Sequence, residues 1–214
     1  MKIGVLAIQG DFDAHAEVLQ RLGVEHSLVK TPNDMQGISG LILPGGESTT
    51  HLKILKEEGL LQAIQKFAAN GGAFFGTCAG VILLAREVRS PAQESLGFLD
   101  VAVERNAYGR QLASHVHHGI STLRDAPIEM VFIRAPIIES LGSSVKILAQ
   151  DEGRPVLVEQ GRILAATFHP ELTRETTVHE HFLAMCENSE SAPASGLRQS
   201  ATPPLTAETS RSRG

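Results

Sequence analysis

The sequence predicts an α/β fold in which a mainly parallel sheet carries helices on both faces. Apolar, β-rich runs alternate with helical patterns through the first 88 residues, the order that right-handed β-α-β crossovers produce. One early run, GLILPGG at 40–46, is apolar throughout before its Pro-Gly-Gly turn, which suits a strand buried on both faces. The length of 214 residues allows one core that buries roughly 70% of the unfolded surface.

The first half of the chain supplies most of the parallel sheet. KIGVLAI at 2–8 is predicted to be a strand, and the helical spacing that follows closes at Gly23. VEHSLVK at 24–30 is a second strand, and 40–46 is a third. The segment from Glu47 opens with Ser and Thr residues that can cap a helix, and its helical spacing continues to the Asn-Gly-Gly at 70–72.

A fourth strand and a helix meet at Cys78. AFFGT at 73–77 is the strand, and AGVILLAREV at 79–88 is the helix. Further strands are predicted at FLDVAVER (98–105), MVFIRAP (130–136), VKILAQ (145–150), PVLVEQ (155–160) and RILAATF (162–168). With few helices between them they predict a small antiparallel or mixed extension, including a tight turn at Gln160-Gly161. A final helix is expected around 175–187.

Composition excludes several classes of function. The formal net charge of −5 gives no basic footprint for nucleic acid. The N-terminal apolar run is too short for a signal peptide or a membrane span, so we expect a cytoplasmic protein. Both cysteines are therefore expected to be reduced thiols. Residues 188–214 are rich in Ser, Thr and Pro, which predicts a disordered tail after a single domain at 1–187.

The segment around Cys78 is the first candidate for chemistry. Gly76-Thr77-Cys78-Ala79-Gly80 has the form Gly-x-nucleophile-x-Gly, which places a nucleophile on a strained turn between a strand and a helix. The helix N-terminus would favour a thiolate, and the Ala79 N–H could donate to an oxyanion. The alternative is a small cysteine buried in a core strand. This segment alone leaves both interpretations open.

Two further segments could complete a site. TFHPEL places His169 and Glu171 on either side of Pro170, just after a predicted strand. A cysteine nucleophile needs such a base and an acceptor that orients it, although His-Pro-Glu also occurs in ordinary surface loops. LPGGESTT at 43–50 offers either a nest of backbone N–H donors or a plain strand-to-helix turn. It lacks the P-loop lysine, which disfavours a nucleoside triphosphate.

Together these segments resemble a known family. PGGEST, GTCAG and FHPELT are similar to motifs of class I (triad-type) glutamine amidotransferases. VERNAYGRQ at 103–111 and FIRAP at 132–136 resemble the glutaminase subunits of pyridoxal 5'-phosphate synthase within that family. The resemblance runs from GVLAIQG to about residue 187. It implies the three-layer, flavodoxin-like fold of the class I enzymes.

The resemblance also implies roles for individual residues. Cys78 attacks the glutamine amide, His169 is base and then acid, and Glu171 orients the imidazole. The glutamine pocket maps onto Gly46, Glu47, Ser48, Arg105, Ile133 and Arg134. The oxyanion donors map onto the backbone of Gly45, Gly46 and Ala79. The implied partner is a ring-forming synthase subunit that makes pyridoxal 5'-phosphate from a pentose phosphate and glyceraldehyde 3-phosphate, and no cofactor or metal is implied.

The sequence departs from the family pattern in places. Ala107-Tyr108 stands where relatives often have Ser-Phe. The stretch SHVHHGIS contains His115, His117 and His118, and a metal site there is disfavoured because no Cys or carboxylate is near in sequence. Three alternatives remain: a same-fold cysteine hydrolase, a glutaminase subunit of another synthase, and a non-catalytic scaffold. An intact set of nucleophile, base and orienting carboxylate argues against the scaffold.

Overall fold

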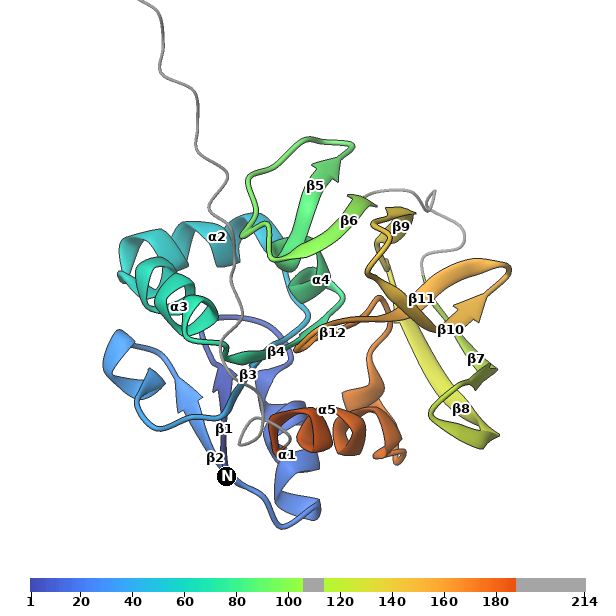
Figure 1. The fold of residues 1–214 in the computed structure, drawn as a ribbon, viewed down its shortest axis with the longest axis horizontal. Helices are drawn as coiled ribbons and strands as arrows, with labels where there is room; N and C mark the ends of the chain where they lie inside the picture. The colour runs from blue at the N-terminus through green and yellow to red at the C-terminus, as the bar shows by residue number, and fades with distance from the viewer. Residues whose placement is uncertain (106–113, 188–214) are drawn as a thin grey trace, which may run out of the picture.

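The structure is a computed structural model and describes residues 1–105 and 114–187 (Figure 1). The tail expected from residue 188 and the Ala107-Tyr108 pair lie outside the described residues. Within the described part, the helices are too short or too polar to cross a membrane.

A nine-stranded sheet forms the centre of the molecule, in the order β2-β1-β3-β4-β12-β11-β10-β7-β8. Its strands are β1 (Lys2–Leu6), β2 (Glu25–Val29), β3 (Gly40–Leu43), β4 (Ala73–Thr77), β7 (Ser114–Ser121), β8 (Arg124–Ile133), β10 (Lys146–Asp151), β11 (Arg154–Gln160) and β12 (Ile163–Ala166). From β2 to β12 neighbouring strands are parallel, and from β12 to β8 they are antiparallel. The expected parallel sheet with an antiparallel extension is confirmed.

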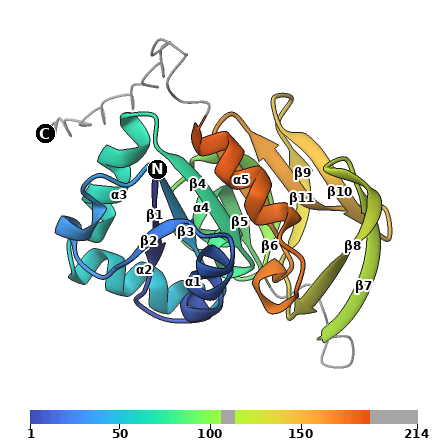
Figure 2. The same cartoon turned by 90° about the horizontal axis from the view of Figure 1, so that it is seen from below.

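Helices cover both faces of the parallel part (Figures 1 and 2). Helices α2 (Ser48–Glu57), α3 (Leu60–Ala69) and α4 (Ala79–Leu84) lie on one face, and α1 (Phe12–Arg21) and α5 (Thr177–Glu187) lie on the other. Two short 3-10 turns, η1 (Pro32–Met35) and η2 (Pro170–Leu172), complete the set. The three-layer arrangement matches the predicted fold class.

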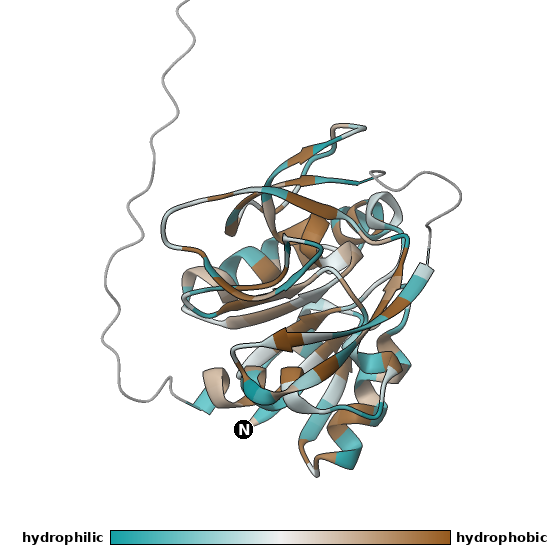
Figure 3. Cartoon of the chain, turned by 90° about the vertical axis from the view of Figure 1, so that its right-hand side faces the viewer, coloured by the Kyte–Doolittle hydropathy of each residue, from teal (hydrophilic) through white to brown (hydrophobic). Residues whose placement is uncertain are grey.

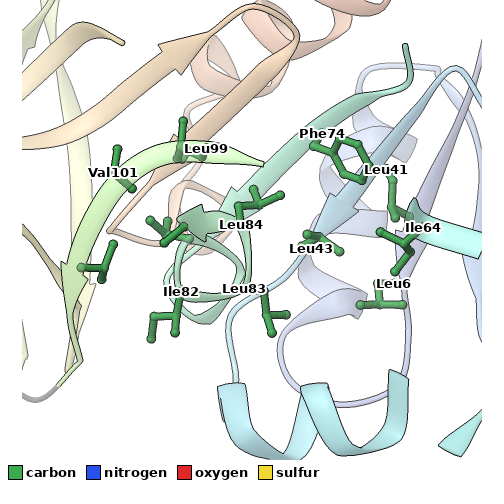
Figure 4. Close-up of a cluster of buried hydrophobic side chains, with 14 of the residues drawn as sticks. Leu6, Leu41, Leu43, Ile64, Phe74, Ile82, Leu83, Leu84, Leu99 and Val101 are labelled. Carbon is green, nitrogen blue, oxygen red and sulfur yellow. The ribbon is translucent and has the colours of Figure 1, made fainter. Parts of the chain in front are cut away.

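The apolar strands face a hydrophobic core on each side of the sheet. In β4, Phe74 belongs to the cluster under α2, α3 and α4, whereas Phe75 belongs to the cluster under α1 and α5. In β3, Leu41 and Leu43 join the first cluster and Ile42 joins the second. Figure 4 shows part of the first cluster, and Figure 3 shows apolar strands flanked by helices of mixed polarity. Burial on both faces explains why these strands read as unbroken apolar runs.

Two predicted helices end earlier than expected. The helix predicted over 79–88 stops at Leu84, and Ala85–Arg89 forms strand β5. Ala85 and Val88 are buried there while the intervening residues are exposed, a spacing typical of a helix. The strand accommodates it because its pairing with β6 shifts register between Ala85 and Glu87. The helix predicted from Glu47 to Asn70 divides at Gly59, whose φ of 70° only glycine adopts at little cost.

A second, three-stranded sheet packs beside the first. It consists of β5, β6 (Leu99–Glu104) and β9 (Ile137–Leu141). Strands β5 and β6 are parallel, and β6 and β9 are antiparallel. The sequence did not predict β5, β7 or β9. By contrast, β4 has the predicted bounds, and the turn at Gln160-Gly161 is confirmed because Gln160 pairs with Ile163 across a two-residue loop.

Helix α4 sits against the end of β3 at a contact that only glycine permits. A Cβ added to Gly80 would lie 2.0 Å from the Leu43 carbonyl oxygen, which is backbone and cannot turn aside. We therefore expect Gly80→Ala to lower the free energy of unfolding by about 3 kcal/mol or more. Gly71→Ala is the matched control, because its Cβ would meet nothing within 4 Å and only its positive φ opposes alanine. That variant should lose about 1 kcal/mol, and equal losses in urea unfolding would contradict the proposed contact.

Candidate active site

Cys78 lies on the turn between β4 and α4. Its φ of 47° and ψ of −101° fall outside the regions that L-residues favour, at a cost on the order of 1–3 kcal/mol. The Cys78 N–H donates to the Ala166 carbonyl at 2.9 Å, which fastens the turn to β12. A Cβ on Gly76 would lie 2.8 Å from the Gly80 carbonyl carbon. The two glycines therefore allow the close backbone approach that this turn requires.

His169 and Glu171 follow β12, the strand that pairs with β4. Because β12 and β4 are parallel and Ala166 pairs with Thr77, the residues after both strands emerge at the same edge of the sheet. His169 Nδ1 and Glu171 Oε1 are 2.8 Å apart, and both side chains are buried. The His169 N–H also donates to the Val131 carbonyl at 2.8 Å, so its backbone is held from β8.

The electrostatics of this cluster favour a charged imidazole. Burial opposes a charge on His169, but hydrogen bonds to Cys78 and Glu171 and the negative charge of these partners outweigh it and raise the pKa of His169 to about 10. Burial also raises the pKa of Glu171, and the hydrogen bond from His169 offsets part of that effect. The arrangement supports a charged imidazole between the Cys78 sulfur and a buried carboxyl group.

The Gly-Gly turn after β3 lies directly against the imidazole. A Cβ on Gly45 would lie 2.4 Å from His169 Cε1, and one on Gly46 would lie 2.6 Å from Gln9 Oε1. Gln9 Oε1 accepts the Glu47 N–H at 2.8 Å, and the Gln9 carbonyl contacts His51 Nε2 at 2.8 Å. His51 was not among the residues expected at the site. Gln9 lies just after the first parallel strand, which is where a residue beside the site is expected.

Glu47 is held tightly at the start of α2. Its carboxylate accepts the N–H groups of Thr49 and Thr50 at 3.1 and 2.7 Å, and Arg105 Nη2 donates to it at 3.2 Å. Burial would raise the pKa of Glu47, but the hydrogen bonds from Thr49 and Thr50 outweigh it and lower the pKa to about 2. Ser48 is buried and donates to Gln93 Oε1 at 2.9 Å. Thus Glu47 and Arg105 come together, while the Ser48 hydroxyl is already used within the protein.

The end of β8 completes the surroundings of the thiol. Cys78 Sγ contacts the Ile133 carbonyl at 3.9 Å. Arg134, the next residue, has a φ of 45°. A positive φ is uncommon for residues other than glycine, and such residues cluster at functional sites. The two adjacent residues predicted for the pocket thus lie where β8 approaches Cys78.

One cluster of potential metal ligands converges in the described part of the chain, and the histidines of β7 also lie near a carboxylate. Asp11, His169 and Glu171 each place one ligand atom within 4.8 Å of the others, and the hydrogen bond between the last two accounts for that spacing without an ion. On β7, His115 and His117 lie 3.4 and 3.5 Å from different oxygens of the Asp151 carboxylate.

No carboxylate is near these histidines in sequence, and the fold brings one to them from β10. The three groups do not converge on one point, because their ligand atoms do not all fall within 4.8 Å of one another. His118 is separate and lines, with His117, a hollow of about 660 Å³ on β7 and β10. None of the residues predicted for the active site lines this hollow.

Comparison with known proteins now identifies the family. The model of the SNO glutamine amidotransferase family matches residues 5–188. The chain belongs to the SNO glutamine amidotransferase family.

Two proteins with curated names are similar to this chain over nearly their whole length. A protein of Koribacter versatilis named pyridoxal 5'-phosphate synthase subunit PdxT is 53% identical over 191 residues, which cover 89% of this chain and 98% of the relative. A protein of Thermotoga maritima with the same name is 50% identical over 186 residues, 86% of this chain and 99% of the relative. The resemblance seen in the sequence motifs is confirmed.

Solved structures share the fold of this chain. A crystal structure described as a glutamine amidotransferase superposes with a TM-score of 0.82 and 45% identity, covering 86% of this chain and 98% of that one. A putative GMP synthase protein from Thermoplasma acidophilum has a TM-score of 0.64 at 18% identity, over 89% of this chain and 96% of that one. The second comparison shows the fold alone.

Proposed function

We propose that the chain hydrolyses L-glutamine to L-glutamate and ammonia and delivers the ammonia to a synthase subunit that makes pyridoxal 5'-phosphate. The observation that carries the proposal is the Cys78 turn with His169 and Glu171 at the same edge of the sheet, in a chain about half identical to proteins named pyridoxal 5'-phosphate synthase subunit PdxT. We further expect the protein to work in the cytoplasm, in a complex with a ring-forming synthase.

The proposed reaction uses Cys78, His169 and Glu171 in the charge states that let a thiolate attack and an imidazolium donate a proton. The Cys78 thiolate attacks the side-chain carbon of glutamine, and the carbonyl oxygen takes up the negative charge. The N–H of Ala79 at the start of α4, with those of Gly45 and Gly46, stabilises that oxyanion. The His169 imidazolium gives its proton to the leaving ammonia, and a glutamyl thioester remains. His169, now neutral, removes a proton from water, which hydrolyses the thioester while Glu171 holds the ring in place.

The proposed glutamine pocket lies between the start of α2 and the end of β8. Arg105 provides a charge for the α-carboxylate of glutamine. Glu47 faces the α-ammonium, although Thr49, Thr50 and Arg105 already bind its carboxylate. The remaining proposed contacts come from Gly46, Ser48, Ile133 and Arg134.

The contacts of Gln9 with the Gly45-Gly46 turn indicate that the synthase subunit controls glutaminase activity. Gln9 Oε1 takes the Glu47 N–H at 2.8 Å, next to the proposed oxyanion donors. The Gln9 side chain also lies against Gly46, where an added Cβ would be 2.6 Å from Gln9 Oε1. It therefore crowds the proposed oxyanion donors, and we expect the chain alone to be a weak glutaminase. Docking of the synthase subunit would then have to displace Gln9 for full activity.

The test is glutamate release measured with and without the synthase subunit. We expect slow release by the chain alone, a marked increase with the ring-forming partner, and pyridoxal 5'-phosphate formation from glutamine only when both are present. Intact mass after treatment with a glutamine-like electrophile should show one adduct on Cys78. If no glutamate forms even with the partner, the proposed activity is wrong. Activation by another synthase instead would favour the alternative of a glutaminase serving a different pathway.

Arg105 offers a separate test of the pocket. Arg105→Gln removes the charge proposed for the α-carboxylate and also frees Glu47 from its contact at 3.2 Å. We expect the KM for glutamine to rise by about tenfold or more with a smaller change in kcat, because the lost contact is made in both the ground and transition states. Arg89→Gln is the matched control, since that exposed arginine binds Glu87 and Glu139 instead. A loss confined to kcat would contradict the assignment.

A further inference from the structure

A buried polar cluster lies directly behind the proposed catalytic residues and has no role in the mechanism above. His15 of α1 and His179 of α5 are fully buried, and so is Thr77 at the end of β4. His15 Nδ1 is 3.0 Å from His179 Nε2, and His15 Nε2 is 3.1 Å from Thr77 Oγ1. Helices α1 and α5 lie side by side on this face of the sheet (Figures 1 and 2).

His15 lies close both to Glu171 and to the residue before Cys78. Its Nε2 also lies 3.5 Å from Glu171 Oε2, the carboxylate oxygen that does not face His169 and that forms no hydrogen bond among the described residues. Thr77, the other neighbour of Nε2, immediately precedes Cys78 in the chain. His15 Nε2 therefore faces two residues. One is Glu171, which orients His169, and the other is Thr77, which precedes Cys78 in the turn.

The two buried imidazoles are neutral. Burial lowers the pKa of His179 to about 3, with a smaller contribution from the charge of Arg21. Burial, and then the positive charge of a protonated His179 or His169, lowers the pKa of His15 well below its usual value. Phe75 packs its ring edge-on against both imidazoles, which keeps the cluster apolar. Each ring therefore carries a single N–H.

The position of each N–H follows from the unpaired atoms of the cluster. His179 Nδ1 and Glu171 Oε2 are both buried without a hydrogen-bond partner, and an unpaired buried donor or acceptor costs about 1–3 kcal/mol. Nδ1 is unpaired in either tautomer, whereas Glu171 Oε2 faces an N–H only if the proton of His15 lies on Nε2. In that tautomer the His179 proton lies on Nε2, where it donates to His15 Nδ1. The single proton of His15 then points at Thr77 Oγ1 and Glu171 Oε2.

We propose that His15 is a positioning residue, whose Nε2–H fixes the Glu171 carboxylate against His169 and ties it to the residue that precedes Cys78. This inference rests on the proposed function for its role in turnover, but not for its effect on the reactivity of the thiol. A donor at Oε2 stabilises the ionised carboxylate, which burial and the nearby charge of Asp11 both disfavour. His169 is the other group that faces this carboxylate, and it supplies the opposing positive charge.

The test compares three replacements of His15. Gln can place an amide N–H near the position of Nε2, Asn reaches only the region of Nδ1, and Phe supplies neither donor. The readout is the rate at which iodoacetamide alkylates Cys78 between pH 5.5 and 9, followed by intact mass, which needs neither glutamine nor a partner. Thermal unfolding checks that each variant is folded.

The expected result follows the ionisation of Glu171. Without the donor the carboxyl group stays protonated to higher pH, so the imidazolium loses its counter-charge as pH falls. His15→Phe should move the acidic limb of the alkylation profile up by about one pH unit, which is about tenfold in rate at pH 6. His15→Asn should behave like Phe, and His15→Gln should stay within about threefold of the unchanged protein. With the synthase present, kcat should fall while KM for glutamine stays constant.

Two controls separate positioning from a general structural effect. His179→Phe leaves His15 in place but removes the donor that sets its tautomer, so a smaller shift in the same direction is expected. His26→Phe replaces a half-buried histidine on β2, away from the cluster, and should leave the profile unchanged. An unshifted profile in folded His15→Phe would overturn the proposal, as would equal profiles for Gln and Asn. Should His15→Phe not fold, the Gln and Asn pair still decides.

Discussion

Cys78→Ala should abolish glutamate release, with a loss of at least about 10⁴-fold in kcat. In the proposed mechanism the thiolate forms the covalent bond to glutamine, and the only other thiol, Cys186, is buried on α5 and does not replace it. Alanine keeps the Cβ of the turn residue, so the unusual backbone of Cys78 meets no new clash. We therefore expect the variant to fold and to bind the synthase subunit nearly as well as the unchanged protein. Glutamate release and co-elution with the partner measure the two outcomes.

Cys186 provides the matched control for this prediction. It is buried on α5 in the core under α1 and α5, and burial raises the pKa of its thiol to about 12, which makes it a poor nucleophile. Cys186→Ala should keep glutaminase activity and the electrophile adduct on Cys78. Loss of partner binding together with activity in Cys78→Ala would instead mean that Cys78 has a structural role.

His169→Gln is expected to lower kcat by at least about 10³-fold. Glutamine preserves a polar group near Glu171 but can neither carry the positive charge nor transfer the proton to ammonia. Alkylation of Cys78 at pH 6 should also slow, because the imidazolium that stabilises the thiolate is gone. His181→Gln, a change at a surface histidine bound to Glu159, is the control and should keep both rates. A fully reactive thiol in His169→Gln would mean that the two side chains are not coupled.

The raised pKa of His169 predicts how the free energy of unfolding depends on pH. Because the pKa of His169 is raised to about 10 in the folded protein, folding favours its charged form. That contribution is fully present below the ordinary histidine pKa of about 6.5 and is lost as pH rises through about 10. The difference in unfolding free energy between the protein and His169→Gln should therefore narrow from pH 6.5 to pH 10. A difference that widens over this range would contradict a charged imidazole.

Local sequence signals placed the parallel half of the fold. Strand β4 was predicted to the residue, because full burial on both faces leaves an apolar run whose ends are marked by Gly71-Gly72 and by the turn at Cys78. Strands β5, β7 and β9 were not predicted. Strand β7 exposes most of its side chains, and β5 continues an apolar helix without a breaking residue. Their pairing partners, and not their own composition, make them strands.

The sequence by itself determined the parallel sheet, the turn that carries Cys78, and, through motifs that resemble a family, the residues expected beside it. These features are encoded in short segments, where glycine spacing and hydrophobic pattern act on neighbouring residues. Only the tertiary structure decided that His15 faces Glu171, that Gln9 takes the Glu47 N–H, and that Asp151 lies between two histidines. Each of these contacts joins residues more than thirty positions apart. A buried polar side chain is stabilised by whichever partner the fold brings to it, and that partner leaves no mark in the local pattern.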